Sequence, residues 1–435
     1  MSTAIRWTGD AATLRADDRR ALFERAASSD ATLRERAASI VARVRGGGDA
    51  ALRALATELD GVALDTIEVP RERWDAALAA LDPALRRAME RSAANIRRVH
   101  EAFRPSPCEV ESEPGVVIGR RPDPLGRVGV YAPGGRAAYP SSLLMGVIPA
   151  RVAGVGEIVV CSPPERTTGV PSDVVLAAAA LAGADRVFAI GGAGAIAALA
   201  FGTETVPRVD RIVGPGNAYV AEAKVLVANT VAIDSPAGPS ELLVLADDTA
   251  DPEVVVREML AQAEHDPLAA VIAVTTSRAL AASVERGLEA AIASQPRAEI
   301  VAAALRGQGA VLSADSLETA IALANDYASE HLLLLVSSPE SVLEQLRNAG
   351  TVFIGAPSSV AFGDYATGAN HVLPTGGLAR SYSGLSTLDF VRWTTYQRVS
   401  ADAAASLAED VGIFADAERL GGHAAAARAW KRVVS

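Results

Sequence analysis

Hydrophobic positions follow two different patterns along the chain, and the change occurs near residue 127. Up to about Phe103 the apolar residues are set among Ala, Arg and Glu in a helical pattern, which predicts a helical N-terminal region. From Arg127 onward, short β-branched runs alternate with alanine-rich amphipathic segments. This alternation is typical of βα units that build a parallel sheet.

The predicted strands form two series. The first series is RVGVYA, EIVVCS, RVFAIG, RIVG and TVAID, and the second is ELLVLAD, AAVIAV, GAVLSA, LLLLVS and TVFIG. The two blocks, roughly 127–235 and 241–355, share an element order but no residue-by-residue repeat. We therefore expect an α/β protein with two tandem, incomplete Rossmann-like parallel-sheet domains.

Two further segments follow the second block. An irregular stretch after Gly355 contains Asp364, Asn370 and His371. Irregular loops longer than ~15 residues in compact domains are usually functional or disordered, and the polar residues here favour a functional loop. The last fifty or so residues return to a helical pattern, which predicts a small helical C-terminal tail domain.

Composition narrows the class of protein. Half of the residues are hydrophobic and 21% are charged, as in an ordinary globular protein. No signal-like apolar run opens the chain, and the longest apolar run, 174–184, is far shorter than the ~20 residues that span a bilayer. The net charge of −11 argues against nucleic acid and anionic membranes as partners. The two cysteines, Cys108 and Cys161, are typical of packing residues in a reducing cytoplasm.

Three of the five histidines have neighbours that suggest chemistry. In AQAEHDP, Gln262 and His265 are three apart in the last turn of a helix that must end near Pro267. The amide oxygen and the imidazole nitrogen could hold one cation together. A polar helix end with His265 near the helix dipole is the alternative.

The second and third histidines belong to other segments. Glu330 and His331 lie where a helix passes into the strand LLLLV, and they supply two proton-transfer groups; a solvated helix end is the alternative. Asp364, in GDYATGANH, and Glu418 with His423, in AERLGGH, add the oxygen and nitrogen donors of a mixed metal site. No local spacing joins these segments, so the pattern alone leaves the metal site open.

Signals for a nucleotide cofactor are weaker. The run AIGGAGAIAALA places Gly192, Gly194 and Ala197 in a dinucleotide-type spacing, but a glycine-rich chain produces such matches by chance. The turns YAPGGRAAYPSS and VGPGNAYVAEAK would let backbone N–H groups approach an anionic ligand. Ordinary tight βα connections would have the same composition.

Taken together, these segments resemble the histidinol dehydrogenase family. The motifs that carry the resemblance are GVYAPGGRAAYPSSLLM, GPGNAYVAEAK, DSPAGPSELLVLAD, AQAEHDP, NDYASEHLLL, GDYATGANHVLPTGG and AERLGGH. The match covers nearly the whole chain and is strongest from Pro122 to Arg392. Several motifs are long and unusual, so their occurrence in this order is highly specific.

The resemblance implies a set of site residues. It implies one Zn²⁺ per subunit held by Gln262, His265, Asp364 and His423, and Glu330 with His331 as the proton-transfer pair. The implied substrate contacts are Ser240, Gln262, His265, His331, Asp364, Glu418 and His423. The implied NAD contacts are Tyr131 and Asn217. Gly194 stands where the family usually has a glutamine, so the side-chain contact to NAD is absent there.

The resemblance also implies the domain division. We expect an N-terminal arm at 1–27, a first Rossmann-like domain at 28–130 and 240–385 with the metal and catalytic residues, and a second at 131–239 with the NAD contacts. The tail at 386–435 is expected to cross to the partner in a homodimer with shared active sites.

The implied reaction is the NAD-dependent four-electron oxidation of L-histidinol to L-histidine through L-histidinal, the last step of histidine biosynthesis. A related dehydrogenase of another amino or hydroxy alcohol is an alternative. A metallohydrolase could use the same zinc donors with Glu330 as the base, although it would leave the glycine-rich turns without a purpose. A non-catalytic binding protein would be expected to lack Glu330 or His331, and both are present.

Overall fold

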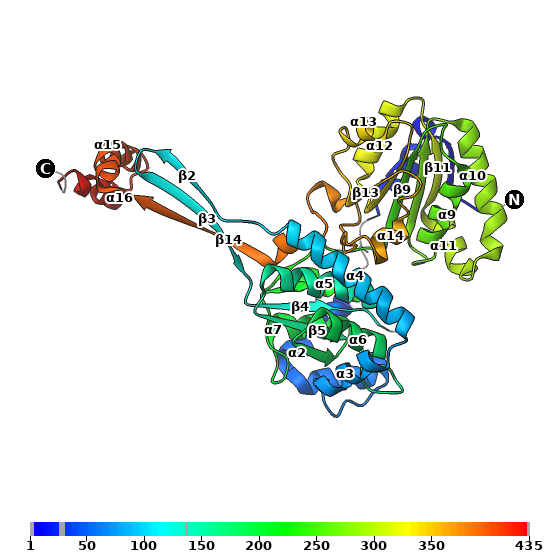
Figure 1. The fold of residues 1–435 in the computed structure, drawn as a ribbon, viewed down its shortest axis with the longest axis horizontal. Helices are drawn as coiled ribbons and strands as arrows, with labels where there is room; N and C mark the ends of the chain where they lie inside the picture. The colour runs from blue at the N-terminus through cyan, green and yellow to red at the C-terminus, as the bar shows by residue number, and fades with distance from the viewer. Residues whose placement is uncertain (1–3, 26–30, 135–137, 433–435) are drawn as a thin grey trace. The chain divides into compact units, whose positions relative to one another are not determined.

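The computed structural model describes residues 4–25, 31–134 and 138–432. The chain divides into two compact units, the first made of Met1–Phe103 with Gly126–Phe390 and the second of Arg104–Leu125 with Val391–Ser435. The first unit contains two parallel sheets and the second contains a small antiparallel sheet (Figure 1). Within the described ranges, no helix is both long and apolar enough to cross a bilayer.

A six-stranded parallel sheet has the strand order β1-β11-β10-β9-β12-β13. Its strands are β1 (Trp7–Asp10), β9 (Glu241–Ala246), β10 (Ala270–Thr275), β11 (Gly309–Ser313), β12 (His331–Leu335) and β13 (Thr351–Ile354). From β9 the chain winds outward through β10 and β11, then returns to the other side of β9 as β12 and β13. The strand order therefore reverses between β9 and β12, as in a doubly wound fold.

Helices cover both faces of this sheet (Figure 1). Successive side chains of a strand point to opposite faces, so Leu242 and Val244 pack with α9, α10 and α11, while Leu243 and Leu245 pack with α1, α12 and α13. The helices on the two sides are α9 (Pro252–Ala263), α10 (Arg278–Ala291), α11 (Ala298–Gln308), α1 (Ala16–Phe23), α12 (Leu317–Tyr327) and α13 (Pro339–Leu343). Because both faces are buried, strands β9, β10 and β12 are largely apolar.

A five-stranded parallel sheet follows the same plan, with the order β6-β5-β4-β7-β8. Its strands are β4 (Arg127–Tyr131), β5 (Glu157–Ser162), β6 (Arg186–Ala189), β7 (Arg211–Val213) and β8 (Ala232–Ile233). The connecting helices are α5 (Pro140–Ala153), α6 (Asp173–Ala182), α7 (Gly192–Phe201) and α8 (Ala218–Val227). Here the order reverses between β4 and β7.

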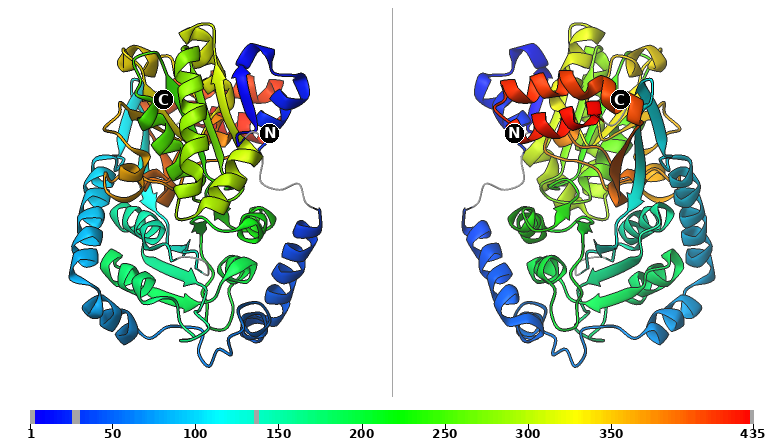
Figure 2. Two further views of the ribbon diagram at one scale, coloured as in Figure 1. Left: turned by 90° about the vertical axis from the view of Figure 1, so that its right-hand side faces the viewer. Right: turned by 90° about the vertical axis from the view of Figure 1, so that its left-hand side faces the viewer.

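The N-terminal helices form an outer layer on the five-stranded sheet. Helix α2 (Ala31–Leu55) packs on α7 and α8, whereas α3 (Arg71–Ala80) packs on α6 and α4 (Pro83–Ala102) packs on α5 (Figure 2). The division predicted from the sequence groups residues 28–130 with the metal-binding domain. Helices α2, α3 and α4 pack mainly on α5–α8, the helices that connect the strands of the five-stranded sheet. The apolar residues Val44, Leu52 and Leu55 of α2 face the glycine- and alanine-rich α7 at Gly194.

The second unit combines a three-stranded antiparallel sheet with two helices. The sheet has the order β14-β3-β2, from β2 (Cys108–Glu113), β3 (Val116–Pro124) and β14 (Val391–Val399), and the helices are α15 (Ala401–Ala417) and α16 (Gly421–Arg428). Gly119 pairs with Tyr396, and a Cβ on Gly119 would collide with the tyrosine ring. A larger residue at position 119 would therefore force the Tyr396 ring to move.

Every strand predicted from the sequence is present, and the helical N-terminal and C-terminal regions are confirmed. The structure adds β1, β2, β3 and β14. The tail is therefore not purely helical, because its strand β14 pairs with β3, far away in the sequence.

Candidate functional site

Glu330 and His331 lie at the start of β12, which runs between β9 and β13 in the six-stranded sheet. Strand β12 pairs with β9, and His331 aligns with Leu242. Both side chains are buried, and the half-buried Ser240 immediately precedes β9. The site therefore lies at the amino ends of β9 and β12, whereas doubly wound sheets usually bind ligands at the carboxyl ends.

The two ring nitrogens of His331 have different environments. Nδ1 lies 3.0 Å from the Glu241 carbonyl oxygen, which can only accept, so Nδ1 carries a proton and donates it. Nε2 has no hydrogen-bond partner and lies 3.7 Å from Asp364 Oδ1. In the neutral imidazole, Nε2 thus keeps the free lone pair that a proton acceptor needs.

Charge around His331 favours its protonated form. Burial alone would lower the pKa of His331, but the Glu330 and Asp364 carboxylates and the Glu241 carbonyl outweigh burial and raise the pKa to about 9. The Glu330 Oε2 atom lies 3.4 Å from His331 Nδ1. An imidazolium formed at this position is therefore stabilised.

Glu241 holds both catalytic candidates through its backbone, and the sequence analysis did not identify it. Its N–H donates to Glu330 Oε2 at 2.7 Å, and its carbonyl accepts from His331. Its buried carboxylate forms a bidentate pair with Arg25, with both N···O distances 2.9 Å. One signal was available, namely a charged residue at the start of the otherwise apolar run ELLVLA.

Gln262 and His265 lie at the C-terminal end of α9, as predicted. His265 Nδ1 lies 3.1 Å from the Ala261 carbonyl and 3.2 Å from that of Gln262, which fixes the proton on Nδ1 and leaves Nε2 free to act as a ligand. The Gln262 side chain is buried, and its amide nitrogen has no hydrogen-bond partner. This amide N–H₂ therefore lacks an acceptor, a place that a bound water or an oxygen atom of a ligand would fill.

Asp364 lies on the short helix α14 (Val360–Tyr365), which is tied to α9. Glu258 of α9 accepts hydrogen bonds from the Ser359 hydroxyl and the Val360 N–H at the start of α14. One turn farther along the two helices are Gln262 and Asp364. Among the residues that the structure describes, no three His, Cys, Asp or Glu side chains are grouped closely enough to hold a metal ion.

Glu418 and His423 belong to the second unit, and both side chains are exposed. Glu418 ends α15 and His423 lies in the first turn of α16. The first unit alone therefore provides three of the four predicted metal ligands.

The irregular loop after Gly355 fixes the backbone of Asp364. His371 Nδ1 lies 2.9 Å from the Asp364 carbonyl, and His371 Nε2 lies 3.1 Å from the hydroxyl of Ser142 on α5. The Asn370 amide donates to the Met145 carbonyl at 2.8 Å. The loop thus joins the helices of the five-stranded sheet to the site, a role for His371 that its sequence context did not show.

The cofactor candidates lie at the carboxyl ends of β4 and β7, where the strand order reverses. The Tyr131 hydroxyl accepts from the N–H of Gly192 at 3.1 Å, and burial raises the pKa of Tyr131 to about 12. Gly214 has φ +113°, and a Cβ there would collide with the Tyr131 carbonyl. The exposed Asn217 caps α8 by accepting from the N–H groups of Tyr219 and Val220. This is the edge where dinucleotides bind in such sheets.

Gly194 and the turn YAPGGRAAYPSS belong to the cofactor site predicted from the sequence. Gly194 is buried inside α7, and a Cβ on it would lie 3.4 Å from Leu55 Cδ1 of α2. This position therefore faces a helix–helix contact. Of the predicted turn YAPGGRAAYPSS, residues 135–137 lie outside the described part of the chain.

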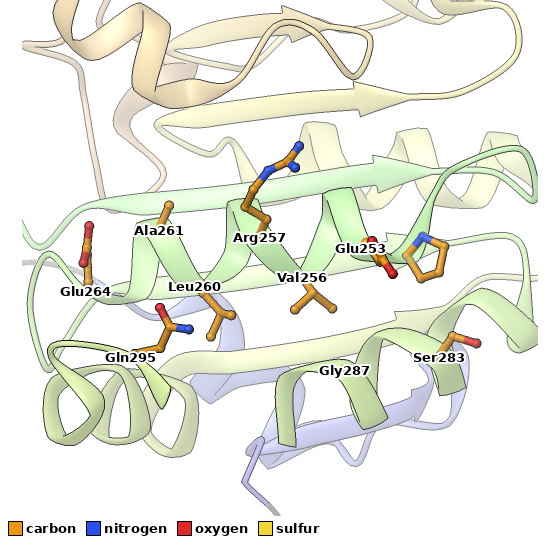
Figure 3. Close-up of a pocket in the computed structure, with 10 residues that line it drawn as sticks. Glu253, Val256, Arg257, Leu260, Ala261, Glu264, Ser283, Gly287 and Gln295 are labelled. Atoms are coloured by element: carbon orange, nitrogen blue, oxygen red, sulfur yellow. The ribbon is translucent and has the colours of Figure 1, made fainter. Parts of the chain in front are cut away.

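A cavity of about 560 Å³ lies between α9 and α10 and is separate from these residues. Figure 3 shows Val256 and Leu260 of α9 pointing toward α10 in this cavity. None of the predicted site residues lines it.

Comparisons with known proteins agree on one family. The family model described as histidinol dehydrogenase matches residues 23–430. A histidinol dehydrogenase of Halobacterium salinarum is 50% identical over 95% of this chain and 96% of its own length, and that of Methanothermobacter thermautotrophicus is 48% identical over 89% and 91%. The crystal structure of histidinol dehydrogenase from Elizabethkingia anophelis superimposes with a TM-score of 0.94 at 34% identity, covering 100% of this chain and 99% of that one.

These relatives offer no support for a metallohydrolase or a non-catalytic binding protein. The expected α/β fold and the expected family are both confirmed. This chain belongs to the histidinol dehydrogenase family.

Proposed function

We propose that this chain oxidises L-histidinol to L-histidine through L-histidinal, with NAD as the oxidant, as the last step of histidine biosynthesis. Family membership supports the substrate. The buried Glu330–His331 pair, in which His331 Nε2 has no partner, is the observation that carries the chemistry. It provides two proton-transfer groups within one enclosed site.

In the alcohol step, the neutral form of His331, which predominates above its pKa of about 9, takes the hydroxyl proton at Nε2 as hydride leaves the carbinol carbon. The Nδ1–H bond to the Glu241 carbonyl keeps the ring oriented while the charge develops. The Glu330 carboxylate, 3.4 Å from Nδ1, stabilises the resulting imidazolium. Bound NAD would supply the hydride acceptor for both oxidations.

In the aldehyde step, Glu330 takes a proton from a water molecule as the water oxygen bonds to the aldehyde carbon. The resulting hydrate then loses a hydride from carbon and a proton from one hydroxyl, which yields the carboxylic acid. Overall, one alcohol and one water give the carboxylate, two reduced NAD and three protons. A single buried site for both steps limits side reactions of the reactive aldehyde.

We assign one zinc ion per subunit to Gln262, His265, Asp364 and His423 of the partner subunit. Imidazole nitrogen with oxygen donors suits zinc, and the free Nε2 of His265 fits this role. The bound ion would orient the substrate's amino and imidazole groups. The proposed substrate contacts are Ser240, Gln262, His265, His331, Asp364, Glu418 and His423.

For NAD we propose contacts with Tyr131 and Asn217. Both lie at the carboxyl edge of the five-stranded sheet, near backbone that only glycine can adopt at Gly214. The close approach of chain and ligand that such glycines allow is typical of dinucleotide sites.

We further propose a homodimer in which the second unit completes the partner's site. Its buried side chains are mostly small, namely Val116, Ala403, Ala408, Ala415 and Ala424. Its exposed apolar side chains are large, with Phe414 71% exposed, and include Val411, Ile413, Leu420 and Trp430. Such a surface on a small unit favours a protein partner. The free cysteines Cys108 and Cys161 suit the cytoplasm, where we place the enzyme.

The test is a steady-state assay of NAD reduction with purified, zinc-loaded enzyme and a panel of amino and hydroxy alcohols. We expect histidinol to give the highest kcat/KM, and chelation to abolish turnover until zinc is restored. A higher kcat/KM for another alcohol, or full turnover by metal-free enzyme, would overturn the substrate or the metal assignment respectively.

A further inference from the structure

A buried ion pair between Arg25 and Glu241 lies next to the catalytic candidates Glu330 and His331. Neither member of the pair is itself a proton-transfer residue of the proposed mechanism. The Arg25 side chain is 5% exposed and that of Glu241 is 2% exposed. A buried ion pair adds little net stability when compared with apolar residues of similar size. Its location therefore calls for another explanation.

One residue fixes the two catalytic side chains. The Glu241 N–H donates to Glu330 Oε2 at 2.7 Å, and the Glu241 carbonyl accepts from His331 Nδ1 at 3.0 Å. A shift of residue 241 would therefore move Glu330, the base of the aldehyde step. The same shift would rotate the ring of His331, the base of the alcohol step.

The side chain of Glu241 fixes that backbone from three directions. Its Oε1 accepts from Arg25 Nε at 2.9 Å and from the Gly376 N–H at 2.7 Å. Its Oε2 accepts from Arg25 Nη2 at 2.9 Å and from the Glu330 N–H at 3.3 Å. The carboxylate thus joins the N-terminal arm, the loop around Gly376 and the catalytic segment.

Arg25 also supports the turn that leads into Glu330. Its Nη2 donates to the carbonyl of Tyr327 at 2.7 Å and approaches that of Ala328 at 3.5 Å. The guanidinium carbon lies 3.4 Å from the centre of the Tyr327 ring. Ala328 has φ 52°, a left-handed conformation that is unfavourable for a non-glycine residue. Strain of this kind persists only where the surroundings hold it in place.

We propose that Arg25 and Glu241 are positioning residues, which hold Glu330 and His331 in the geometry that both oxidation steps require. This proposal rests on the proposed function of the Glu330–His331 pair. It makes the N-terminal arm part of the active-site structure, although the hydrogen bonds of Arg25 go to Phe23, Glu241, Tyr327 and Ala328, and not to Glu330 or His331 themselves.

The test compares Glu241→Gln, Arg25→Met and Arg25→Lys as zinc-loaded enzymes, with Glu68→Gln as the control. Glu68 pairs with Arg186 at the five-stranded sheet, away from the site. We expect Glu241→Gln and Arg25→Met to lower kcat roughly 10- to 100-fold for both histidinol and histidinal, as for other residues that orient catalytic groups. KM and zinc content should change little. Arg25→Lys should recover part of the loss, and Glu68→Gln should behave like wild type.

A second readout does not depend on activity. In protein labelled with ¹⁵N-histidine, the hydrogen-bonded Nδ1 proton of His331 is assigned by its disappearance in His331→Gln. We expect this signal to shift or to exchange faster with water in Glu241→Gln and Arg25→Met, and to be unchanged in Glu68→Gln. If wild type does not oxidise histidinol, the proposed function fails while the NMR comparison still tests the positioning role.

An unchanged His331 signal together with unchanged kcat per folded molecule would overturn the proposal, even if the melting temperature falls. In that case the pair would only stabilise the fold. If Glu241→Gln does not fold, Arg25→Lys and Arg25→Met decide the question, because they leave the catalytic segment's own sequence intact.

Discussion

Glu330 and His331 are neighbours in sequence, yet their contacts give them different tasks. His331 presents an unpartnered Nε2 beside Asp364, whereas the Glu330 carboxylate is held by the Glu241 N–H. The alcohol must lose a proton directly, while the aldehyde must first gain water. The division of labour between the two residues follows from this difference.

This division predicts different effects of two substitutions. His331→Ala should slow the oxidation of both histidinol and histidinal, because both steps release a proton. Glu330→Gln should mainly slow histidinal oxidation, by roughly 10²- to 10⁴-fold, as for the loss of a general base. Single-turnover rates with each substrate measure this, and equal slowing of both steps by Glu330→Gln would argue against separate roles.

For a substitution of Gly194 by glutamine, the sequence and the structure lead to opposite predictions. Restoring the family's glutamine would be expected to tighten NAD binding, but this position packs 3.4 Å from Leu55. We expect Gly194→Gln to lower the melting temperature and to leave the KM for NAD unchanged or raised, because an amide without a partner would enter an apolar contact. Gly194→Ala, the matched control, should keep the wild-type melting temperature. A lower KM for NAD in Gly194→Gln would show that the side chain reaches the cofactor.

At the level of elements, strand prediction succeeded where both faces of a strand are buried. Runs such as ELLVLA and HLLLL are apolar after their first residue, and such a continuous apolar run is the local sign of a strand buried in a parallel sheet. The strands β2, β3 and β14 were missed for the opposite reason. CEVESE is exposed at every position, and VRWTTYQRV gains its partner from residues 116–124, so nothing local identifies the pairing.

Site residues, too, could be predicted where a local motif marks them, and not where their contacts arise only from the fold. Motifs placed Gln262 and His265 correctly at a helix end, and Glu330 and His331 correctly at a strand end. The role of Arg25 could not be predicted, because its partner Glu241 is brought to it only by the fold. His371 likewise acquires its contacts with Asp364 and Ser142 through tertiary structure.

Helix α4 carries a buried titratable group that should make stability depend on pH. His100 is 2% exposed, neither ring nitrogen has a hydrogen-bond partner, and burial lowers the pKa of His100 to about 4. The unfolded chain, with a pKa near 6.5, therefore binds a proton more readily than the fold does. The contribution of neutral His100 to the free energy of unfolding is complete above pH 6.5 and is lost as the pH falls toward 4. The free energy of unfolding changes there by at most about 1.4 kcal/mol per pH unit.

The matched comparison is His100→Leu, which removes the titration and keeps an apolar side chain. We expect the free energy of unfolding in urea to fall more steeply in wild type than in His100→Leu between pH 6.5 and 4.5. Parallel pH profiles for the two proteins would contradict a buried neutral imidazole.

At the scale of the whole molecule, the proposed active site takes residues from two chains. The first unit carries Gln262, His265 and Asp364, and the exposed His423 lies on a second unit with a large apolar surface. Exchange of such an element is a common route to a symmetric dimer.

Complementation between inactive variants tests the exchange. His265→Ala and His423→Ala should each be inactive, but unfolding and refolding them together forms mixed dimers in which one site receives both intact histidines. With random pairing, about a quarter of wild-type activity should return. If each tail serves its own chain, every site keeps one lesion and the mixture stays inactive.

The central claim is that one site carries out two successive oxidations of the same molecule. The most direct measurement is the amount of NADH formed when wild-type enzyme consumes a limiting, known quantity of L-histidinol to completion, with the product identified by chromatography. The account predicts two NADH for each histidinol and L-histidine as the final product. One NADH for each histidinol with the aldehyde accumulating, or no NADH at all, would contradict it.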